Sequence, residues 1–219
     1  MTPPSGHDDD GRGRRSALVG LVAYSQRKPC RLAPQAPGRH ASTKQGGLAM
    51  SFMKLAAERY SVRKFSSRSV EPEKLATVLE AGRLAPTAAN KQPQRIFVLQ
   101  SEAALAAVRE STKFHFSTPL VLLVCYDEAK AWQNPFTGRS SGEVDAAIVT
   151  THLMLAAASL GLGTTWVGYF KPEPLIEFCK LPAGIKPVAM LPLGYPAADA
   201  TPSPMHGSRE ALTATVKYL

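Results

Sequence analysis

RYSVR at residues 59–63 places two guanidinium groups and a hydroxyl on alternate positions, just after an amphipathic run at residues 52–58. In an extended segment every second side chain points the same way, so Arg59, Ser61 and Arg63 can converge on one ligand. Arginine presents a planar fork of donors that suits phosphate oxygens, and the spacing therefore predicts a site for a phosphate-bearing cofactor. The alternative is an arginine-rich loop that is simply solvated.

Composition restricts the class of protein. The chain has 219 residues, of which 44% are hydrophobic and 20% charged, as expected for a soluble globular protein with one sizeable core. The formal net charge is +9, but the first fifty residues hold eight Lys or Arg against three Asp, so about half of the excess lies there. The remainder is only mildly basic, which argues against nucleic-acid binding. No uninterrupted apolar stretch reaches the roughly 20 residues that span a bilayer, so we expect no membrane association.

Cysteine usage predicts a protein without a metal in a reducing compartment. Cys30, Cys125 and Cys179 are far apart and form neither a C-x-x-C pair nor a metal-binding spacing. Cys125 lies in an apolar run and Cys179 beside Phe178, which is typical of buried thiols. The histidines of the body are isolated from other metal-type ligands. We therefore expect a cytoplasmic location and no metal site.

Residues 1–49 differ in composition from the rest of the chain. They are rich in Gly, Pro, Ser and Arg, and such a segment buries too little surface to offset the entropy of ordering it. A pair of arginines before an apolar stretch loosely imitates a signal sequence, but an acidic run upstream of it argues against that reading. We predict that residues 1–49 are a disordered extension or a misassigned start, with synthesis beginning at Met50 or Met53. Residues 50–219 then form the functional domain.

The body of the chain alternates apolar runs with helical patterns. Proline at a first helical turn and serine at a cap mark helix starts, and runs rich in Val, Leu and Ile mark strands. We predict strands at residues 95–99, 120–126, 164–167 and 187–193. We predict helices from Pro72, over residues 101–110 and 142–160, and from Pro172 or Pro174 to Phe178.

This order indicates helices covering a central sheet. The helix at residues 142–160 is apolar on most sides, so it should be buried in the core or against a second subunit. Gly161 is a natural end for it, because glycine tolerates a left-handed conformation. No G-x-G-x-x-G follows a strand and no P-loop motif occurs, which excludes the common nucleotide-binding loops.

Four segments in order resemble the FMN-dependent nitroreductase family. They are RYSVRKF at residues 59–65, APTAANKQP at 85–93, LGLGTTWVG at 160–168, and LGYP at 193–196 followed by a basic tail that contains Arg209. The resemblance covers residues 51–219. It implies an α+β, three-layer fold with a central mixed or antiparallel sheet of four to five strands flanked by helices. It also implies an intertwined homodimer that binds FMN in two sites along the interface.

The resemblance assigns the site residues by position. Arg59, Ser61 and Arg63 match positions that hold the phosphate, ribityl chain and pyrimidine edge of the flavin, and Arg209 matches a basic residue that completes the phosphate site. Another segment would come from the other subunit: Pro86, Thr87, Ala88 and Asn90, with Gln92 as a nearby ribityl or ring contact. The backbone at the third segment would face the flavin around N5 and O4: Trp166, Val167 and Gly168.

The chemistry of these residue types agrees with the assignment. Arg63 is the candidate cation that favours the reduced, anionic flavin, because arginine does not lose its proton in a protein. Asn90 and Gln92 can both donate and accept, which suits ribityl hydroxyls. We expect the Trp166 side chain to pack in the core, with its backbone the important part. No side chain is assigned as a catalyst, since the cofactor supplies the reactive atoms.

Two departures from the family pattern bear on the site. Gln94 stands where the family often has Trp after the Gln-Pro pair. The tail reads Ser-Arg-Glu at residues 208–210 without paired basic residues, so the phosphate should depend more on Arg59. The segment at residues 130–142 is predicted to be a loop that covers the flavin and sets substrate choice.

The resemblance implies an NAD(P)H-dependent FMN oxidoreductase. NADH or NADPH would deliver hydride to the flavin, and an electron-poor acceptor such as a nitroaromatic, quinone or activated alkene would then be reduced in a ping-pong cycle. The rivals are a specialised flavoenzyme of the same family (a dehalogenase, an azoline oxidase or a flavin-consuming enzyme) and a flavin-binding redox protein without turnover. A nucleic-acid-binding protein that uses the basic N-terminal segment is a more distant alternative. The sequence contains no motif that selects NADH over NADPH.

Overall fold

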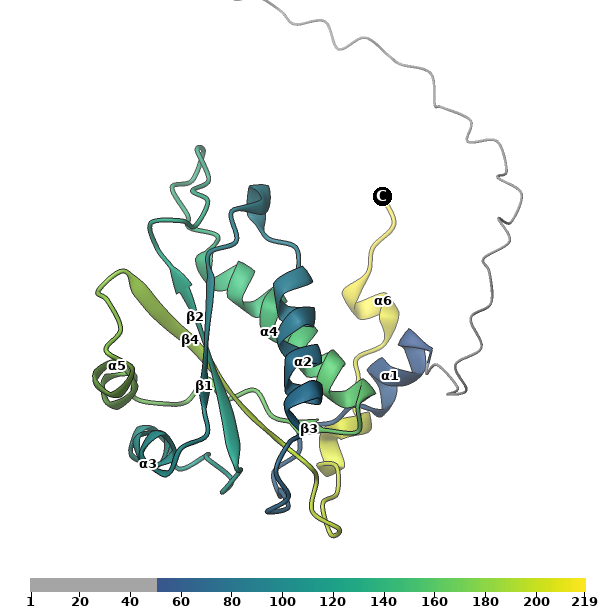
Figure 1. The fold of residues 1–219 in the computed structure, drawn as a ribbon. Coiled ribbons are helices and arrows are strands. Elements are labelled where there is room, and N and C mark those ends of the chain that lie inside the picture. Colours follow the sequence, from purple (N-terminus) through teal and green to yellow (C-terminus); the bar gives the residue numbers. More distant parts are fainter. Residues whose placement is uncertain (1–50) are drawn as a thin grey trace, which may run out of the picture. The chain divides into compact units, whose positions relative to one another are not determined.

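The computed structural model describes residues 51–219, so the predictions for residues 1–49 lie outside the described residues. The strands are β1 (Gln94–Leu99), β2 (Leu120–Asp127), β3 (Gly163–Thr164) and β4 (Ile185–Gly194). The helices are α1 (Phe52–Glu58), α2 (Pro72–Leu84), α3 (Glu102–Ser111), α4 (Gly142–Ser159), α5 (Glu173–Cys179) and α6 (Leu212–Thr215), with short 3₁₀ turns at Ala88–Asn90 and Pro204–Gly207. In Figure 1 the sheet lies between two helical layers, with α1, α2 and α4 on one face and α3 and α5 on the other. The predicted α+β, three-layer fold is confirmed.

The sheet has the order β1-β2-β4-β3, and all three pairings are antiparallel. The predicted strand at residues 164–167 is shorter, because β3 ends at Thr164 and Val167 only forms an isolated bridge with Met190. Thr165 N–H still donates to Pro192 O at 3.3 Å, but a proline has no N–H to return the bond. The ladder is therefore interrupted at this point, and the segment continues along β4 as an edge strand with a gap.

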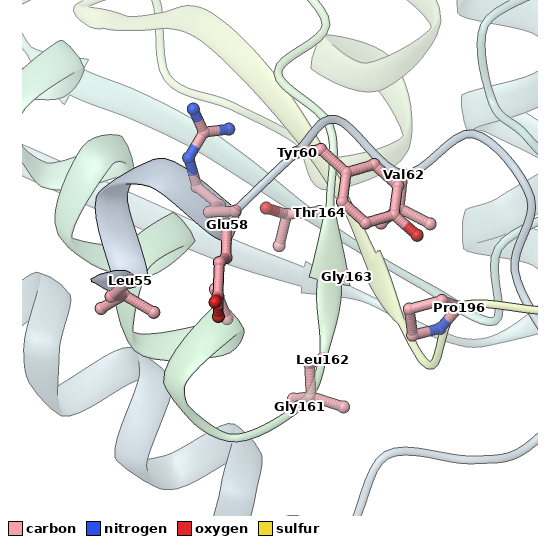
Figure 2. A pocket seen from close by; sticks show the side chains of 11 residues that line it. Leu55, Glu58, Tyr60, Val62, Gly161, Leu162, Gly163, Thr164 and Pro196 are labelled. Atoms are coloured by element: carbon pink, nitrogen blue, oxygen red, sulfur yellow. The ribbon is translucent and has the colours of Figure 1, made fainter. Parts of the chain in front are cut away.

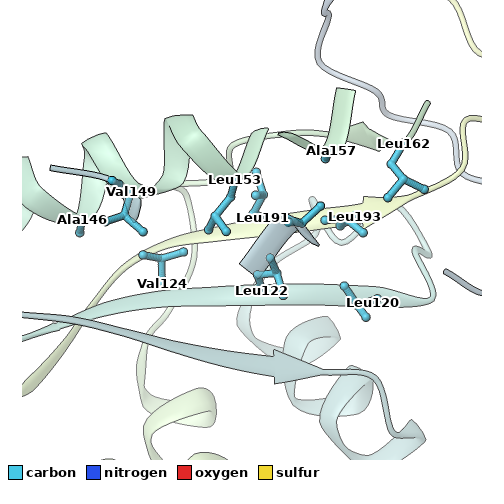
Figure 3. Packing of buried hydrophobic residues seen from close by; sticks show 12 residues of the cluster. Leu120, Leu122, Val124, Ala146, Val149, Leu153, Ala157, Leu162, Leu191 and Leu193 are labelled. Carbon is cyan, nitrogen blue, oxygen red and sulfur yellow. The ribbon is translucent and has the colours of Figure 1, made fainter. Parts of the chain in front are cut away.

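The central strand β2 supplies both hydrophobic cores. Its first six residues are all buried, and alternate side chains point to opposite faces of the sheet. One face packs against α2 and α4, and Figure 3 shows its members: Leu120, Leu122 and Val124 with Leu191 and Leu193 of β4. The other face packs against α3 and α5: Val121, Leu123 and Cys125 with Met190. Burial raises the pKa of the Cys125 thiol to about 12, so this cysteine is a core residue and not a reactive one.

Helix α4 agrees with its prediction to within one residue and ends before Gly161, which has a φ of +74°. Its sheet-facing side is fully buried through Val149 and Leu153 (Figure 3). The opposite side is more open, since Val144 is exposed and Ile148 is half-buried. A single chain therefore buries only part of the apolar surface of this helix. None of the helices in residues 51–219 is long and apolar enough to cross a membrane.

Candidate cofactor-binding site

The segment that contains Arg59, Ser61 and Arg63 is extended, as its alternating pattern predicts. Helix α1 ends at Glu58. The next residue, Arg59, donates its N–H to Leu55 O at 3.0 Å, and its ψ of 130° turns the chain into an extended path. Ser61 then bridges Thr164 in parallel, and Val62 N–H donates to Thr164 O at 3.0 Å. The segment thus adds to the outer edge of β3, and this pairing fixes the direction of its side chains.

Two residues allow this close approach. Val62 is buried, and its carbonyl accepts a hydrogen bond from the Thr165 hydroxyl. A Cβ on Gly163 would lie 2.5 Å from Val62 Cγ2, a distance that real contacts do not reach. Gly163 is therefore needed for the packing of the two segments, whereas Gly161 supplies the end of α4. The two glycines of this motif have different physical roles.

Four of the predicted cofactor ligands come together in one cavity of about 290 Å³. Arg59, Ser61 and Arg63 line it from one side and Arg209 from the C-terminal tail, nearly 150 positions further along the chain. Within residues 51–219 none of the three arginines forms an ion pair with a carboxylate. Three guanidinium groups without carboxylate partners around one hollow fit a phosphate-bearing ligand, because each can donate charge-assisted hydrogen bonds to its acceptor atoms.

The tail is held at this cavity by residues that the sequence analysis did not assign. His206 lies 3.1 Å from Ala57 O through Nε2, and its ring packs edge-to-face on Tyr60 with centroids 6.1 Å apart. Arg209 lines the cavity, and its Nη1 donates to His206 O at 2.7 Å and to Ser208 O at 2.6 Å, so the backbone of the tail holds the guanidinium. Sequence reasoning treated His206 as an isolated histidine. Its position three residues before Arg209 was the available signal, but only the fold places it beside Tyr60.

A second hollow of about 200 Å³ lies beside the first. Figure 2 shows residues that line it: Leu55 and Glu58 of α1, Tyr60 and Val62 of the extended segment, and Leu162 and Pro196. Arg59 and Tyr60 line both hollows, so they form the wall between a cationic cavity and a largely apolar one. A ligand with a charged end and an apolar body suits such a pair of neighbouring spaces.

The LGYP segment stabilises the same region. Tyr195 O–H donates to Glu71 Oε2 at 2.6 Å and accepts from Lys74 Nζ at 2.6 Å, while Arg68 lies 4.0 Å above the ring centroid. The backbone of Tyr195 also accepts from Ser66 N–H at 2.8 Å. Tyr195 therefore connects the end of β4 with the start of α2 and with the extended segment that carries Arg63. The hydrogen bond from Tyr195, with smaller contributions that include Arg68, lowers the pKa of Glu71 to about 2.

The resemblance implies that the backbone of residues 166–168 faces the flavin, but within the described part of the chain only two of the three N–H groups are free to do so. Val167 exchanges both backbone hydrogen bonds with Met190 at 2.9 Å, so its polar atoms face β4. Alternate residues of an edge strand point their N–H groups outward, and Trp166 and Gly168 form no N–H hydrogen bond within residues 51–219. These two N–H groups, and not that of Val167, are available to a ligand.

The expectation that the Trp166 side chain packs in the core is wrong. Its side chain is 36% exposed, whereas Val167 is buried against the α3 and α5 face. The reason is the alternation of an edge strand, which sends Val167 inward and Trp166 to the opposite side.

The segment from Pro86 to Gln92 adopts a strained turn. Ala89, Asn90 and Gln92 have φ values of 48°, 52° and 50°, which non-glycine residues rarely adopt. Gln92 N–H donates to Thr87 Oγ1 at 3.0 Å, and the Gln92 amide donates to Asn90 Oδ1 at 3.2 Å. Several side-chain contacts therefore hold a conformation that the backbone alone disfavours.

Asp145 anchors this turn, and the sequence analysis gave it no role. Its carboxylate is 1% exposed and accepts from Ala88 N–H at 2.8 Å and from the Ser141 hydroxyl at 2.7 Å. Ser141 Oγ accepts in turn from Trp132 N–H at 3.1 Å, so the loop at residues 130–142 shares the anchor. A carboxylate within an apolar helix pattern was the signal for such a role, because a buried carboxylate needs hydrogen-bond donors.

One chain does not bring the two halves of the predicted site together. Asp145 lies in the first turn of α4, whereas Ala158 near its other end lines the hollow beside Arg59. At 1.5 Å per residue the two positions are about 20 Å apart along the helix axis. In Figure 1 the Ala88–Asn90 turn and α1 accordingly lie near opposite ends of α4.

Comparison with known proteins identifies the family. A profile of the Nitroreductase family matches residues 56–119 and 112–195, which include the first three of the four segments above in full and residues 193–195 of the fourth. The chain belongs to the nitroreductase family. Among solved structures, it is similar to a nitroreductase family protein from Clostridium difficile 630, with 39% sequence identity, a TM-score of 0.72, and coverage of 77% of this chain and 98% of that chain.

Two further relatives carry functional descriptions. The FMN reductase (NAD(P)H) of Bacillus subtilis strain 168 is 28% identical over 170 residues, which is 69% of this chain and 68% of that protein. A protein of Exiguobacterium sibiricum 255-15 was solved in complex with FMN and matches with 21% identity and a TM-score of 0.67, covering 78% of this nitroreductase-family chain and 98% of that chain. At that identity the second likeness shows the fold alone.

The close approach at Gly163 predicts a specific stability effect. Gly163→Ala should lower the free energy of unfolding by about 1–3 kcal/mol, because the added methyl group overlaps the buried Val62 side chain. Chemical denaturation of Gly163→Ala, Val62→Ala and the double variant measures the coupling. We expect the double variant to be more stable than the sum of the single effects predicts. Strict additivity would contradict a direct clash between the two side chains.

The low pKa of the Glu71 carboxylate predicts that this group stabilises the fold in a way that depends on pH. Its folded pKa is about 2 against an ordinary value of 4.5, so its stabilisation is present above pH 4.5 and is lost as the pH falls toward 2. Glu71→Gln should therefore flatten the dependence of unfolding free energy on pH between about 4.5 and 2. Glu73→Gln, on the exposed side of the same helix turn, is the control and should leave that slope unchanged. If the unfolding free energy of wild type and of Glu71→Gln changed equally with pH in this range, the lowered pKa of Glu71 would be contradicted.

Proposed function

We propose that this protein is an FMN-dependent oxidoreductase that takes hydride from NADH or NADPH and reduces an electron-poor small molecule in a ping-pong cycle. Nitroaromatics, quinones and activated alkenes are the proposed acceptors. Membership of the nitroreductase family and the likeness to an FMN reductase (NAD(P)H) support the use of FMN and NAD(P)H. The observation that carries the proposal is the convergence of Arg59, Arg63 and Arg209 on one cavity without carboxylate partners among residues 51–219.

The residues of the cavity fit the charged end of the cofactor. Arg59 and Arg209 would hold the phosphate, and the Ser61 hydroxyl a neighbouring polar group of the ribityl chain. Arg63 would supply a fixed positive charge toward the pyrimidine edge, which favours the anionic reduced form. FMN, when bound, supplies the N5 atom that accepts and releases hydride. The outward N–H groups of Trp166 and Gly168 would orient that reactive edge without a titratable side chain.

A homodimer is part of the proposal. The cationic cavity lies near one end of α4 and the turn with Asn90 and Gln92 near the other, so a complete site needs the second half from another copy. The exposed apolar surface supports this arrangement, because Val144 of α4 and large side chains of α1 and the tail lack cover within residues 51–219: Phe52, Met53, Leu212, Val216 and Tyr218. A dimer that covers α4 would bury this surface and place each turn at the partner's cavity.

The loop at residues 130–142 is proposed to set the choice of acceptor. It forms a small hairpin with a bridge between Gln133 and Ser140, and it presents an almost fully exposed Phe136. Through Trp132 and Ser141 it shares the Asp145 anchor with the turn at Asn90. The loop would therefore move to the partner's flavin together with that turn. The free thiols of Cys125 and Cys179 agree with the proposed cytoplasmic location.

The arginine cavity predicts the effect of mutations on FMN binding. Arg59→Ala, Arg63→Ala and Arg209→Ala should each weaken FMN about tenfold or more, because each removes a charge-assisted contact of about 1.5–3 kcal/mol. Quenching of flavin fluorescence on titration of apoprotein measures the affinity, and Lys180→Ala, an exposed charge on another layer, is the control. Colourless purified protein that takes up no FMN would refute the proposed function. FMN binding without oxidation of NADH or NADPH would instead favour a flavin-binding protein without turnover.

The shared site predicts complementation between two defective chains. One variant carries Arg63→Ala and Arg209→Ala; the other carries Gln92→Ala and Asn90→Gly, with glycine chosen because φ is 52° at Asn90. Each should bind FMN weakly alone. In randomly mixed dimers about a quarter of the sites combine two wild-type halves, so tight FMN binding should return to about that level. No recovery in a mixture whose mixed dimers are verified by mass spectrometry would mean that each site is built within one chain.

A further inference from the structure

A separate cavity of about 560 Å³ lies on the sheet face covered by α3 and α5. It is formed by the C-terminal end of α3 and by residues 168–171, which lead toward α5. Two hydrogen bonds fix these walls: Thr112 Oγ1 donates to Tyr169 O at 2.6 Å, and Lys171 N–H donates to Ser111 O at 2.9 Å. Ser111 and Thr112 are both buried. The cavity is therefore a preformed feature of the chain.

The lining of this cavity favours an anion. Arg109, Lys113 and Lys171 contribute three positive charges against the single carboxylate of Glu110. Arg109 is paired with Glu102 on the same helix, but Lys113 and Lys171 form no ion pair within residues 51–219. Both lysines are exposed and can turn toward a ligand. A multiply charged anion suits this arrangement better than a neutral molecule does.

Aromatic rings lie next to these charges. Tyr169 is largely exposed and packs edge-to-face on Phe114 with centroids 5.7 Å apart, while Phe170 lines the cavity half-buried. Lys113 Nζ lies 5.3 Å from the Phe114 ring centroid. An exposed ring held by a second ring offers a stacking surface for a planar base, and the lysine provides a charge beside it.

The position of the cavity connects it to the proposed flavin site. Gly168 lines the cavity, and it is also one of the two residues whose outward N–H is proposed to face the reactive edge of the flavin. A molecule that reacts at that edge can therefore extend into the cavity. The proposed acceptors are neutral and need no cationic pocket. The hydride donor differs, because beyond its nicotinamide it carries a pyrophosphate and an adenine ring.

We infer that this cavity binds the adenosine diphosphate half of NADH or NADPH while the nicotinamide reacts at the flavin. Lys113 and Lys171 bind the pyrophosphate, and Tyr169 stacks on the adenine. This inference rests on the proposed function. It assigns a binding site to the half of the donor that does not take part in hydride transfer. Removal of the two lysines should therefore weaken binding of the donor and leave the rate of hydride transfer unchanged.

The test compares two hydride donors on the FMN-loaded protein. Reduced nicotinamide mononucleotide contains the reacting ring but lacks the adenosine half. In stopped-flow bleaching of the flavin, Lys113→Glu with Lys171→Glu should raise the apparent dissociation constant of NADH about five- to tenfold and that of the mononucleotide less than about twofold. The limiting bleaching rate should not change. Lys180→Glu, an exposed lysine at the end of α5 that does not line the cavity, is the matched control.

A binding measurement without turnover completes the test. Calorimetric titration of the FMN-loaded protein with ADP-ribose should show binding to wild type and Lys180→Glu, and loss of binding in the double variant. Equal NADH affinity in wild type and the double variant, or an equal change for both donors, would overturn the cavity assignment. In either case FMN uptake and bleaching by the mononucleotide would show that the proposed function stands. A protein that takes up no FMN would overturn the proposed function, and this inference with it.

Discussion

Val62 packs against the bare Cα of Gly163, and this contact determines where the outer edge of the sheet lies. Because the two backbones approach so closely, Ser61 can bridge Thr164 and the chain after α1 is held extended. That extended path sets the alternation of Arg59, Ser61 and Arg63 around their cavity. The N–H groups of Trp166 and Gly168 point outward for a different reason, since those of Thr165 and Val167 are bound to β4. The charged end of the proposed flavin site therefore depends on the contact between Val62 and Gly163, and the reactive end on pairing with β4.

Helix α4 separates the two halves of that site. Its first turn holds the strained turn at Asn90 through a buried carboxylate, and its last turns border the hollow beside Arg59. Eighteen residues of rigid helix keep these positions apart in one chain. The same helix presents an apolar side that the chain does not cover completely. Pairing of two copies would bury the open apolar side of α4, and it would bring the site half of one copy next to the complementary half of the other.

Polar networks hold the site where the hydrophobic cores end. Tyr195 joins the end of β4 to Glu71 and Lys74 of the α2 start, and His206 joins the tail to α1. Tyr195 is only partly buried at the margin of one hydrophobic cluster, and His206 belongs to neither cluster. Their hydrogen bonds orient loops that carry arginines, which apolar packing alone cannot do because it is non-directional. Order in this region thus comes from directional contacts around a core that positions the strands.

The sequence by itself determined the elements and the residue types of the site. Periodicity indicated α4 to within one residue, the apolar runs indicated β1, β2 and β4, and ordered motifs indicated the family and the arginines, because these signals depend on near neighbours in the chain. It did not show that Pro192 shortens β3, that Val167 turns its backbone to β4, or that Asp145 and His206 hold the turn and the tail. Those features depend on partners tens of positions away, and only the tertiary structure decides which groups meet. The cavity beside Gly168 also depends on the tertiary structure, since α3 and residues 169–171 carry no motif and share a lining only when the fold brings them together.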